Sequence, residues 1–173
     1  LMTMLIILEQ VQKGSLSLQD TVTVSAAAAR IGGSQVYLKE GETFSVEDLL
    51  YALIVQSAND AAVALALHIA GTTDAFVDMM NQKARAIGMT ATVFHSVHGL
   101  PPGRDQQPDT TTARDIAKLC RMLLNHPDAL RYTGTRERTF RANAPEPFIM
   151  RTHNHLLGSV EGVLESAVIG LPH

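Results

Sequence analysis

The sequence predicts a mixed fold of helices and strands, in which a helix-rich part is joined to fragments of a sheet. Several stretches repeat apolar residues at the spacing of a helix face, which favours amphipathic helices. Shorter runs alternate apolar and polar residues between turn-forming residues, as half-buried strands do. With 173 residues, 46% of them hydrophobic and 18% charged, the chain can bury the core of one domain.

The first 45 residues predict one helix and three short strands. Residues 1–13 are apolar on nearly every side and then amphipathic, and Gly14 is a typical helix end. Residues 20–25, "DTVTVS", alternate threonine and valine as a half-buried strand does. Residues 34–38, "SQVYL", and 43–45, "TFS", predict two further strands around the glycine turn between them.

Helices dominate the middle of the chain. Residues 45–48, "SVED", match the box that caps a helix N-terminus, and an apolar face follows, made of Leu49, Leu50, Leu53 and Ile54. A second helix is predicted from about residue 60 to residue 70, before Gly71. A third begins near Thr73, and a fourth follows the capping box at 112–115. Residues 91–109 predict a long loop, and "RTFRAN", 138–143, a strand.

Composition excludes several function classes. The net charge of −3 and the absence of tryptophan argue against nucleic-acid binding, which needs a basic face or stacking aromatics. Cys120 is the single cysteine, so no disulfide forms within the chain, and we expect a packed thiol. The apolar run at residues 1–8 is shorter than the roughly 20 residues of a membrane span. The chain therefore begins abruptly on a buried segment, and we expect a processed or truncated piece.

The stretch "QSANDAA", 56–62, interrupts two apolar helices with Ser57 and Asn59. One interpretation is that either residue caps a helix starting at Asp60, since both are preferred N-caps. On a helix, residues two apart point in nearly opposite directions, but in a turn they can face the same side. A hydroxyl and a carboxamide would then converge on one cleft, as proton relay and amide binding require.

Four segments, taken in order, resemble the D-alanyl-D-alanine carboxypeptidases, the low-molecular-weight penicillin-binding proteins. They are residues 32–66, from "GGSQVYL" to "VALA", "FHSVHGLPP", "TTTARDIAKL" and "HNHLLG". This family carries the signatures S-x-x-K, S-x-N and K-T-G, and "SAN" at 57–59 matches the second. The resemblance implies that Ser57 relays protons to the leaving D-alanine and that Asn59 hydrogen-bonds the substrate amide. His98, before Gly99 and Leu100, has either a loop-stabilising role or a substrate contact.

The resemblance also implies a fold and an activity. The fold would be of the DD-peptidase and β-lactamase type, an antiparallel sheet flanked by helices, with one partial catalytic domain at 1–173 and a helical lobe at 44–125. The enzyme would be a serine-type carboxypeptidase acting on peptidoglycan stem peptides that end in D-Ala-D-Ala, and a β-lactam target. It would need no metal or cofactor. Such enzymes work in the periplasm or elsewhere on the cell-wall side of the membrane.

Two family signatures are not found in the chain. It contains no Ser-x-x-Lys and no K-T-G, and no lysine follows Lys118. We therefore expect a chain truncated at both ends that cannot form an acyl-enzyme. The alternative is a non-catalytic remnant or pseudoenzyme that binds cell-wall peptide, and the flanking DNA would distinguish the two by whether it encodes Ser-x-x-Lys in frame. We also expect the apolar face of residues 1–8 to be partly uncovered and to favour self-association.

Other site classes fit less well. A class A β-lactamase needs a deacylating glutamate before a segment like "DTTT", and no glutamate lies between Glu47 and Glu137. The histidines at 95, 98, 153 and 155 would make a metal site only by gathering, and "HSVH" lacks a neighbouring acidic ligand. Gly32 and Gly33 predict a tight turn, not an anion site. The charged run 136–138 predicts a solvated face.

Overall fold

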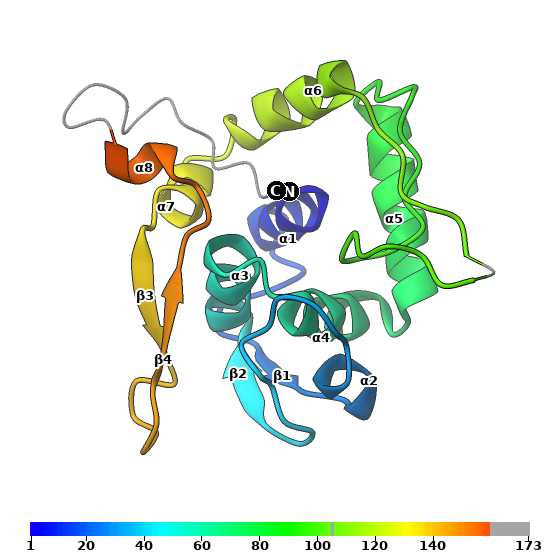
Figure 1. Ribbon diagram of the computed structural model, residues 1–173. Helices are drawn as coiled ribbons and strands as arrows, with labels where there is room; N and C mark the ends of the chain where they lie inside the picture. Colours follow the sequence, from blue (N-terminus) through cyan, green and yellow to red (C-terminus); the bar gives the residue numbers. More distant parts are fainter. Residues whose placement is uncertain (105, 160–173) are drawn as a thin grey trace.

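A computed structural model describes residues 1–104 and 106–159 (Figure 1). The expected domain therefore extends beyond the described residues at its C-terminal end. Helix α1 (Met2–Gln12) lies in the middle, and the later helices surround it. The elements in chain order are α1, β1 (Thr21–Thr23), α2 (Ala26–Ala29), β2 (Thr43–Ser45), α3 (Val46–Val55), α4 (Asn59–Ala70), α5 (Thr73–Ala86), α6 (Ala113–Leu123), α7 (Ala129–Thr133), β3 (Glu137–Phe140), β4 (Phe148–Arg151) and α8 (Leu156–Ser159).

The predicted helices form where their capping residues place them. Ser45 accepts a hydrogen bond from the backbone N–H of Asp48 at the start of α3, and Thr112 does the same for Asp115 at the start of α6. Each such cap stabilises a helix by about 1 kcal/mol. Gly71 ends α4 with φ of 77°, a conformation that glycine adopts without steric cost. The capping boxes and helix ends read from the sequence are confirmed.

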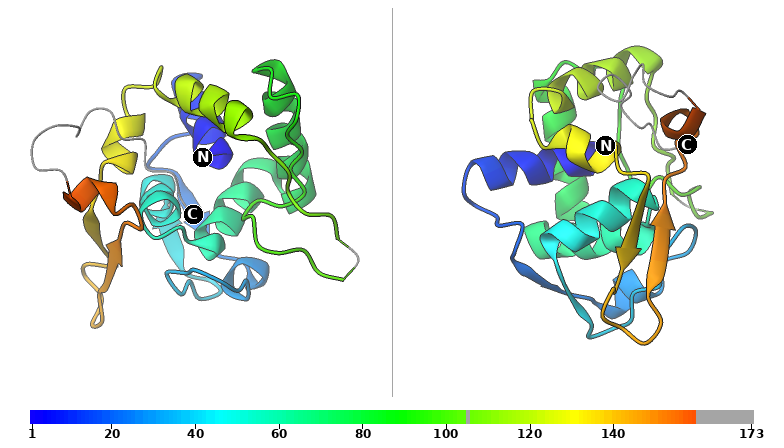
Figure 2. Two further views of the ribbon diagram at one scale, coloured as in Figure 1. Left: turned by 45° about the horizontal axis from the view of Figure 1, so that its top comes forward. Right: turned by 90° about the vertical axis from the view of Figure 1, so that its left-hand side faces the viewer.

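The described strands form two antiparallel pairs. Strand β1 pairs with β2, with Val22 opposite Phe44, and β3 pairs with β4, with Arg138 opposite Met150. Figure 2 shows the β3–β4 hairpin beside α3, and both strands contact that helix. The strand predicted at 43–45 is present in full as β2, and those predicted at 20–25 and 138–143 are present in part as β1 and β3, whereas β4 was not predicted.

The strand predicted at residues 34–38 is absent. The backbone N–H groups of Val36 and Leu38 donate to the carboxylate of Asp60, which leaves them no strand partner. Tyr37 between them has φ of 57°, a left-handed conformation incompatible with an extended strand. The segment is a loop fixed to the start of α4.

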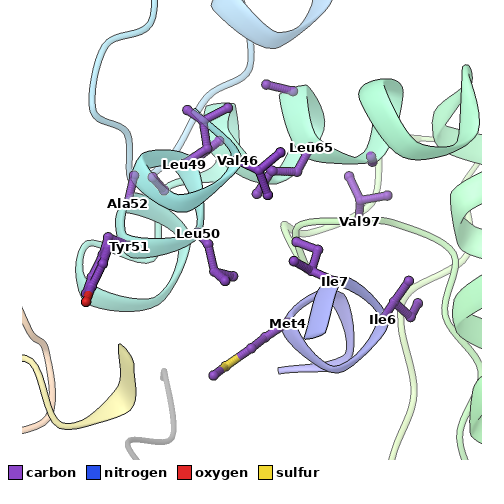
Figure 3. Close-up of a cluster of buried hydrophobic side chains, with 14 of the residues drawn as sticks. Met4, Ile6, Ile7, Val46, Leu49, Leu50, Tyr51, Ala52, Leu65 and Val97 are labelled. Carbon is purple, nitrogen blue, oxygen red and sulfur yellow. The ribbon is translucent and has the colours of Figure 1, made fainter. Parts of the chain in front are cut away.

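Helix α1 forms the centre of the core. Its residues Met2 to Leu8 are all buried, so the prediction of a partly uncovered apolar face is wrong and gives no reason for self-association. Figure 3 shows Met4 and Ile7 in one cluster with Leu50 of α3 and Leu65 of α4. Each fully buried side chain of this size contributes about 1.5–3 kcal/mol.

The charged run 136–138, at the start of β3, is only partly a solvated face. Arg138 stacks over the ring of Tyr51 at 3.8 Å from its centroid and pairs with Asp48 at 3.3 Å. The sequence prediction is therefore wrong for Arg138, which ties β3 to α3.

By length and apolar composition, no single helix in the described part of the chain could cross a membrane. The pair α4 and α5 reaches that length only together, with a bend of 86° between them.

Candidate functional site

Ser57 lies in a tight turn between α3 and α4, in an unusual backbone conformation. Its φ of 55° is left-handed, which costs a residue with a side chain about 1–2 kcal/mol. Helix α4 begins at Asn59, and its N-cap residue, Ala58, makes no side-chain capping bond. The interpretation of Ser57 or Asn59 as a helix cap is therefore wrong. The strained backbone conformation of Ser57 is thus not explained by capping of α4.

The segment 32–34 fixes this turn from outside. The backbone N–H of Asn59 donates to the carbonyl of Ser34 at 2.8 Å, and Asn59 Nδ2 donates to the carbonyl of Gly32 at 3.0 Å. On the other side of Ser57, the hydroxyl of Ser34 donates to the carbonyl of Gln56 at 2.6 Å. Because Gln56 before Ser57 and Asn59 after it are both bonded to this segment, the left-handed conformation of Ser57 is maintained.

Gly33 allows that segment to approach so closely. Its φ is +78°, and a Cβ added to it would lie 2.5 Å from Asn59 Nδ2 and 2.8 Å from Leu100 Cδ2. A side chain at this position would displace Asn59. The tight turn predicted at Gly32 and Gly33 is present. The group of this turn that contacts the Asn59 side chain is the carbonyl of Gly32.

Ser57 and Asn59 line the same cavity. It has a volume of about 180 Å³, enough for several water molecules or one small group of a ligand. It lies against the front end of α1, and its walls come from α1, α3, α4, α5 and the 91–109 loop. The lining residues are Leu1, Met2, Thr3, Leu53, Ile54, Ser57, Asn59, Ala62, Met80, Phe94, Ser96, Val97, His98, Gly99 and Asp109.

Asp109 organises the loop that forms the far wall. Its Oδ1 accepts from the backbone N–H groups of His95 at 2.6 Å and Ser96 at 2.9 Å, and its Oδ2 accepts from Ser96 Oγ at 2.9 Å. Ser96 Oγ in turn accepts from the N–H of Gly99 at 2.8 Å. Sequence reasoning missed Ser96 and Asp109, because residues 13 apart in an irregular loop follow no recognisable spacing.

His98 lines the cavity as a neutral imidazole. Burial lowers the pKa of His98 below its usual 6.5, and the nearby charge of Asp109 opposes that shift. Its Nδ1 accepts from the N–H of Leu100 at 3.1 Å, so the proton of the neutral ring sits on Nε2. Both sequence interpretations of His98 therefore remain compatible, since it bonds within the loop and also borders the cavity.

Besides the carboxylate of Asp109, the cavity offers neutral hydrogen-bonding groups. The hydroxyl of Ser57 can both donate and accept, and the bond to Gly32 uses one of the two Nδ2 hydrogens of Asn59. The second Nδ2 hydrogen and Oδ1 suit a peptide group, which presents one acceptor and one donor. Within residues 1–104 and 106–159, no three histidine, cysteine or acidic side chains are grouped to bind a metal ion.

Comparison with known proteins gives consistent matches along the chain. The family model described as D-alanyl-D-alanine carboxypeptidase matches residues 1–164. The chain is 36% identical over 163 residues to the D-alanyl-D-alanine carboxypeptidase DacF of Bacillus subtilis, covering 94% of this chain and 41% of that protein.

Solved structures agree with that match. Penicillin-binding protein 6B from Escherichia coli superposes with a TM-score of 0.81 at 33% identity, over 91% of this chain and 49% of that one. Penicillin-binding protein D2 from Listeria monocytogenes, in an ampicillin-bound form, superposes with a TM-score of 0.76 at 30% identity, over 93% of this chain and 63% of that one. The chain thus has the expected mixed fold and spans about half or less of most of these relatives.

Proposed function

Because this chain belongs to the D-alanyl-D-alanine carboxypeptidase family, we propose that it provides the Ser57–Asn59 element of a serine-type D-Ala-D-Ala carboxypeptidase. The substrate is a peptidoglycan stem peptide ending in D-Ala-D-Ala, which places the activity on the cell-wall side of the membrane. The observation that supports this proposal most strongly is the left-handed turn at Ser57, beside which Ser57 and Asn59 line one cavity.

Each of the two residues has a role that suits its chemistry. The hydroxyl of Ser57 passes a proton toward the amine of the leaving D-alanine, since it can accept one hydrogen bond while donating another. Asn59 binds the peptide group with its second Nδ2 hydrogen and Oδ1, and its bond to Gly32 fixes its orientation. His98 contributes an Nε2–H donor on the opposite wall.

Acyl transfer needs a nucleophile as well. The 173 residues contain no Ser-x-x-Lys and no K-T-G, so we propose that they bind the peptide without being acylated themselves. β-Lactams are the second proposed class of ligand, supported by the ampicillin-bound relative. A peptide-binding protein without hydrolysis is the alternative function, to which the cavity lined by Ser57 and Asn59 is equally suited.

Peptide binding is tested by titrating the ¹⁵N-labelled chain with an N-acylated D-Ala-D-Ala peptide and, as a control, its L-Ala-L-Ala isomer. We expect the D,D peptide to shift the amide signals of Ser57, Asn59 and His98, and the L,L peptide to leave them in place. Equal shifts with both isomers, or shifts confined to other surfaces, would exclude this cavity as the peptide site.

A further inference from the structure

Asp60, the residue after Asn59, is a buried carboxylate that the proposed function does not use. Only 1% of it is exposed. Its Oδ2 accepts from the backbone N–H of Leu38 at 3.0 Å and from that of Val36 at 3.2 Å, and its Oδ1 accepts from the N–H of Ala61 at 2.9 Å. Two of these donors belong to one loop, so a single side chain on α4 fixes the course of residues 36–38.

A cation fixes the same loop from its other side. Arg141, just after β3, donates from Nη1 to the carbonyl of Val36 at 2.8 Å and from Nη2 to the carbonyl of Tyr37 at 2.9 Å. Arg141 is itself paired with Glu42 at 2.6 Å. Two N–H groups of the loop therefore bind the carboxylate of Asp60, and two carbonyls of the loop bind the guanidinium of Arg141. This pairing maintains the left-handed conformation of Tyr37, whose φ is 57°.

Residues 36–38 follow closely after residues 32–34, which position Ser57 and Asn59. Ser34 and Gly32 accept the two hydrogen bonds of Asn59, and Ser34 donates to Gln56. Hydrogen bonds from Asp60 to residues 36–38 and from Asn59 to residues 32–34 thus tie one continuous segment to the start of α4.

From this path we infer that Asp60 is a positioning residue, which acts through residues 32–38 to keep Ser57 and Asn59 directed at the cavity. The inference rests on the proposed function, because directing this pair matters for activity only if the pair contacts the peptide. Asp60 lines no part of the cavity itself, so its action on a ligand is indirect.

The test compares Asp60→Asn with a matched core variant in the full 173-residue chain. Asn keeps the shape of Asp but replaces one acceptor oxygen with an NH₂ group, which cannot accept from a backbone N–H. Leu123→Ala is the control, because Leu123 is a buried residue of α6 outside the cavity and its truncation lowers stability without touching the loop.

Hydrogen exchange at two amides separates positioning from general stability. The amide of Asn59 donates to Ser34, whereas that of Leu65 lies inside α4. In Asp60→Asn we expect exchange at Asn59 to accelerate about tenfold more than at Leu65, since a buried hydrogen-bond network has lost a partner. In Leu123→Ala, exchange at Asn59 should not accelerate more than at Leu65.

The same samples are titrated with the N-acylated D-Ala-D-Ala peptide. We expect Asp60→Asn to weaken peptide binding about tenfold and Leu123→Ala to leave it unchanged. If Asp60→Asn accelerates both amides equally, the positioning role is refuted. If the selective acceleration at Asn59 appears but no chain binds peptide, the positioning role stands and the proposed function fails.

Discussion

Replacement of Gly33 by alanine should disrupt the site through two separable effects. An alanine at φ of +78° is strained by about 1–2 kcal/mol. Its Cβ would also lie 2.5 Å from Asn59 Nδ2 and 2.8 Å from Leu100 Cδ2, and overpacking of this kind costs about 1–3 kcal/mol. The sum is about 2–5 kcal/mol, which for a domain of this size lowers the melting temperature by roughly 4–20 °C.

Two other glycines separate these effects. Gly71→Ala also places an alanine at a positive φ, +77°, but its Cβ would meet no atom within 4 Å, so it adds backbone strain without overpacking. Gly32→Ala introduces neither effect, although Gly32 adjoins Gly33. Thermal unfolding followed by circular dichroism should rank stability as Gly32→Ala, then Gly71→Ala, then Gly33→Ala. A Gly33→Ala chain that melts with Gly71→Ala would refute the overpacking cost at Asn59 and Leu100.

Three further predictions concern the chemistry. In a longer form of the protein that carries Ser-x-x-Lys, Ser57→Ala should lower the rate of D-alanine release by about 10²–10³-fold, as loss of a proton-transfer group does. Ser15→Ala on the surface should not lower it, and equal rates for the two variants would remove the relay role. A fluorescent penicillin should not label the 173-residue chain covalently, since the chain contains no Ser-x-x-Lys, and a labelled band on a denaturing gel would contradict this. Because folding lowers the pKa of His98, the unfolded chain takes up a proton at this residue first as pH falls below about 6.5, so the free energy of unfolding should decrease there. His98→Asn, which keeps an acceptor for the N–H of Leu100, should show a shallower decrease with pH. Equal pH dependence in the two chains would contradict the lowered pKa of His98.

Features that depend on neighbouring residues were predictable from the sequence. The caps at Ser45 and Thr112 and the glycine end of α4 are interactions within four residues, so their patterns are visible along the chain. The pair Ser57 and Asn59 was singled out because polar residues interrupt two apolar helices, and the resemblance to a family supplied the expected roles.

Features that depend on distant partners were not predictable. The residues at 34–38 have strand-like composition, but Asp60, more than 20 residues later, binds their N–H groups and fixes a loop. The left-handed conformation of Ser57 depends on the hydrogen bonds of Ser34, and the cavity wall depends on Asp109. In each case a carboxylate, a hydroxyl or a backbone group far along the chain decides the local conformation.

A crystal structure of the chain with an N-acylated D-Ala-D-Ala peptide tests the central claim most directly. The claim is that Ser57 and Asn59 face the peptide together. We predict the terminal peptide group in the cavity at the front end of α1, with its amide within about 3 Å of the Asn59 side chain, the distance of a hydrogen bond. A peptide bound elsewhere, or an Asn59 side chain that remains bonded only to Gly32 while the peptide occupies the cavity, would contradict the claim.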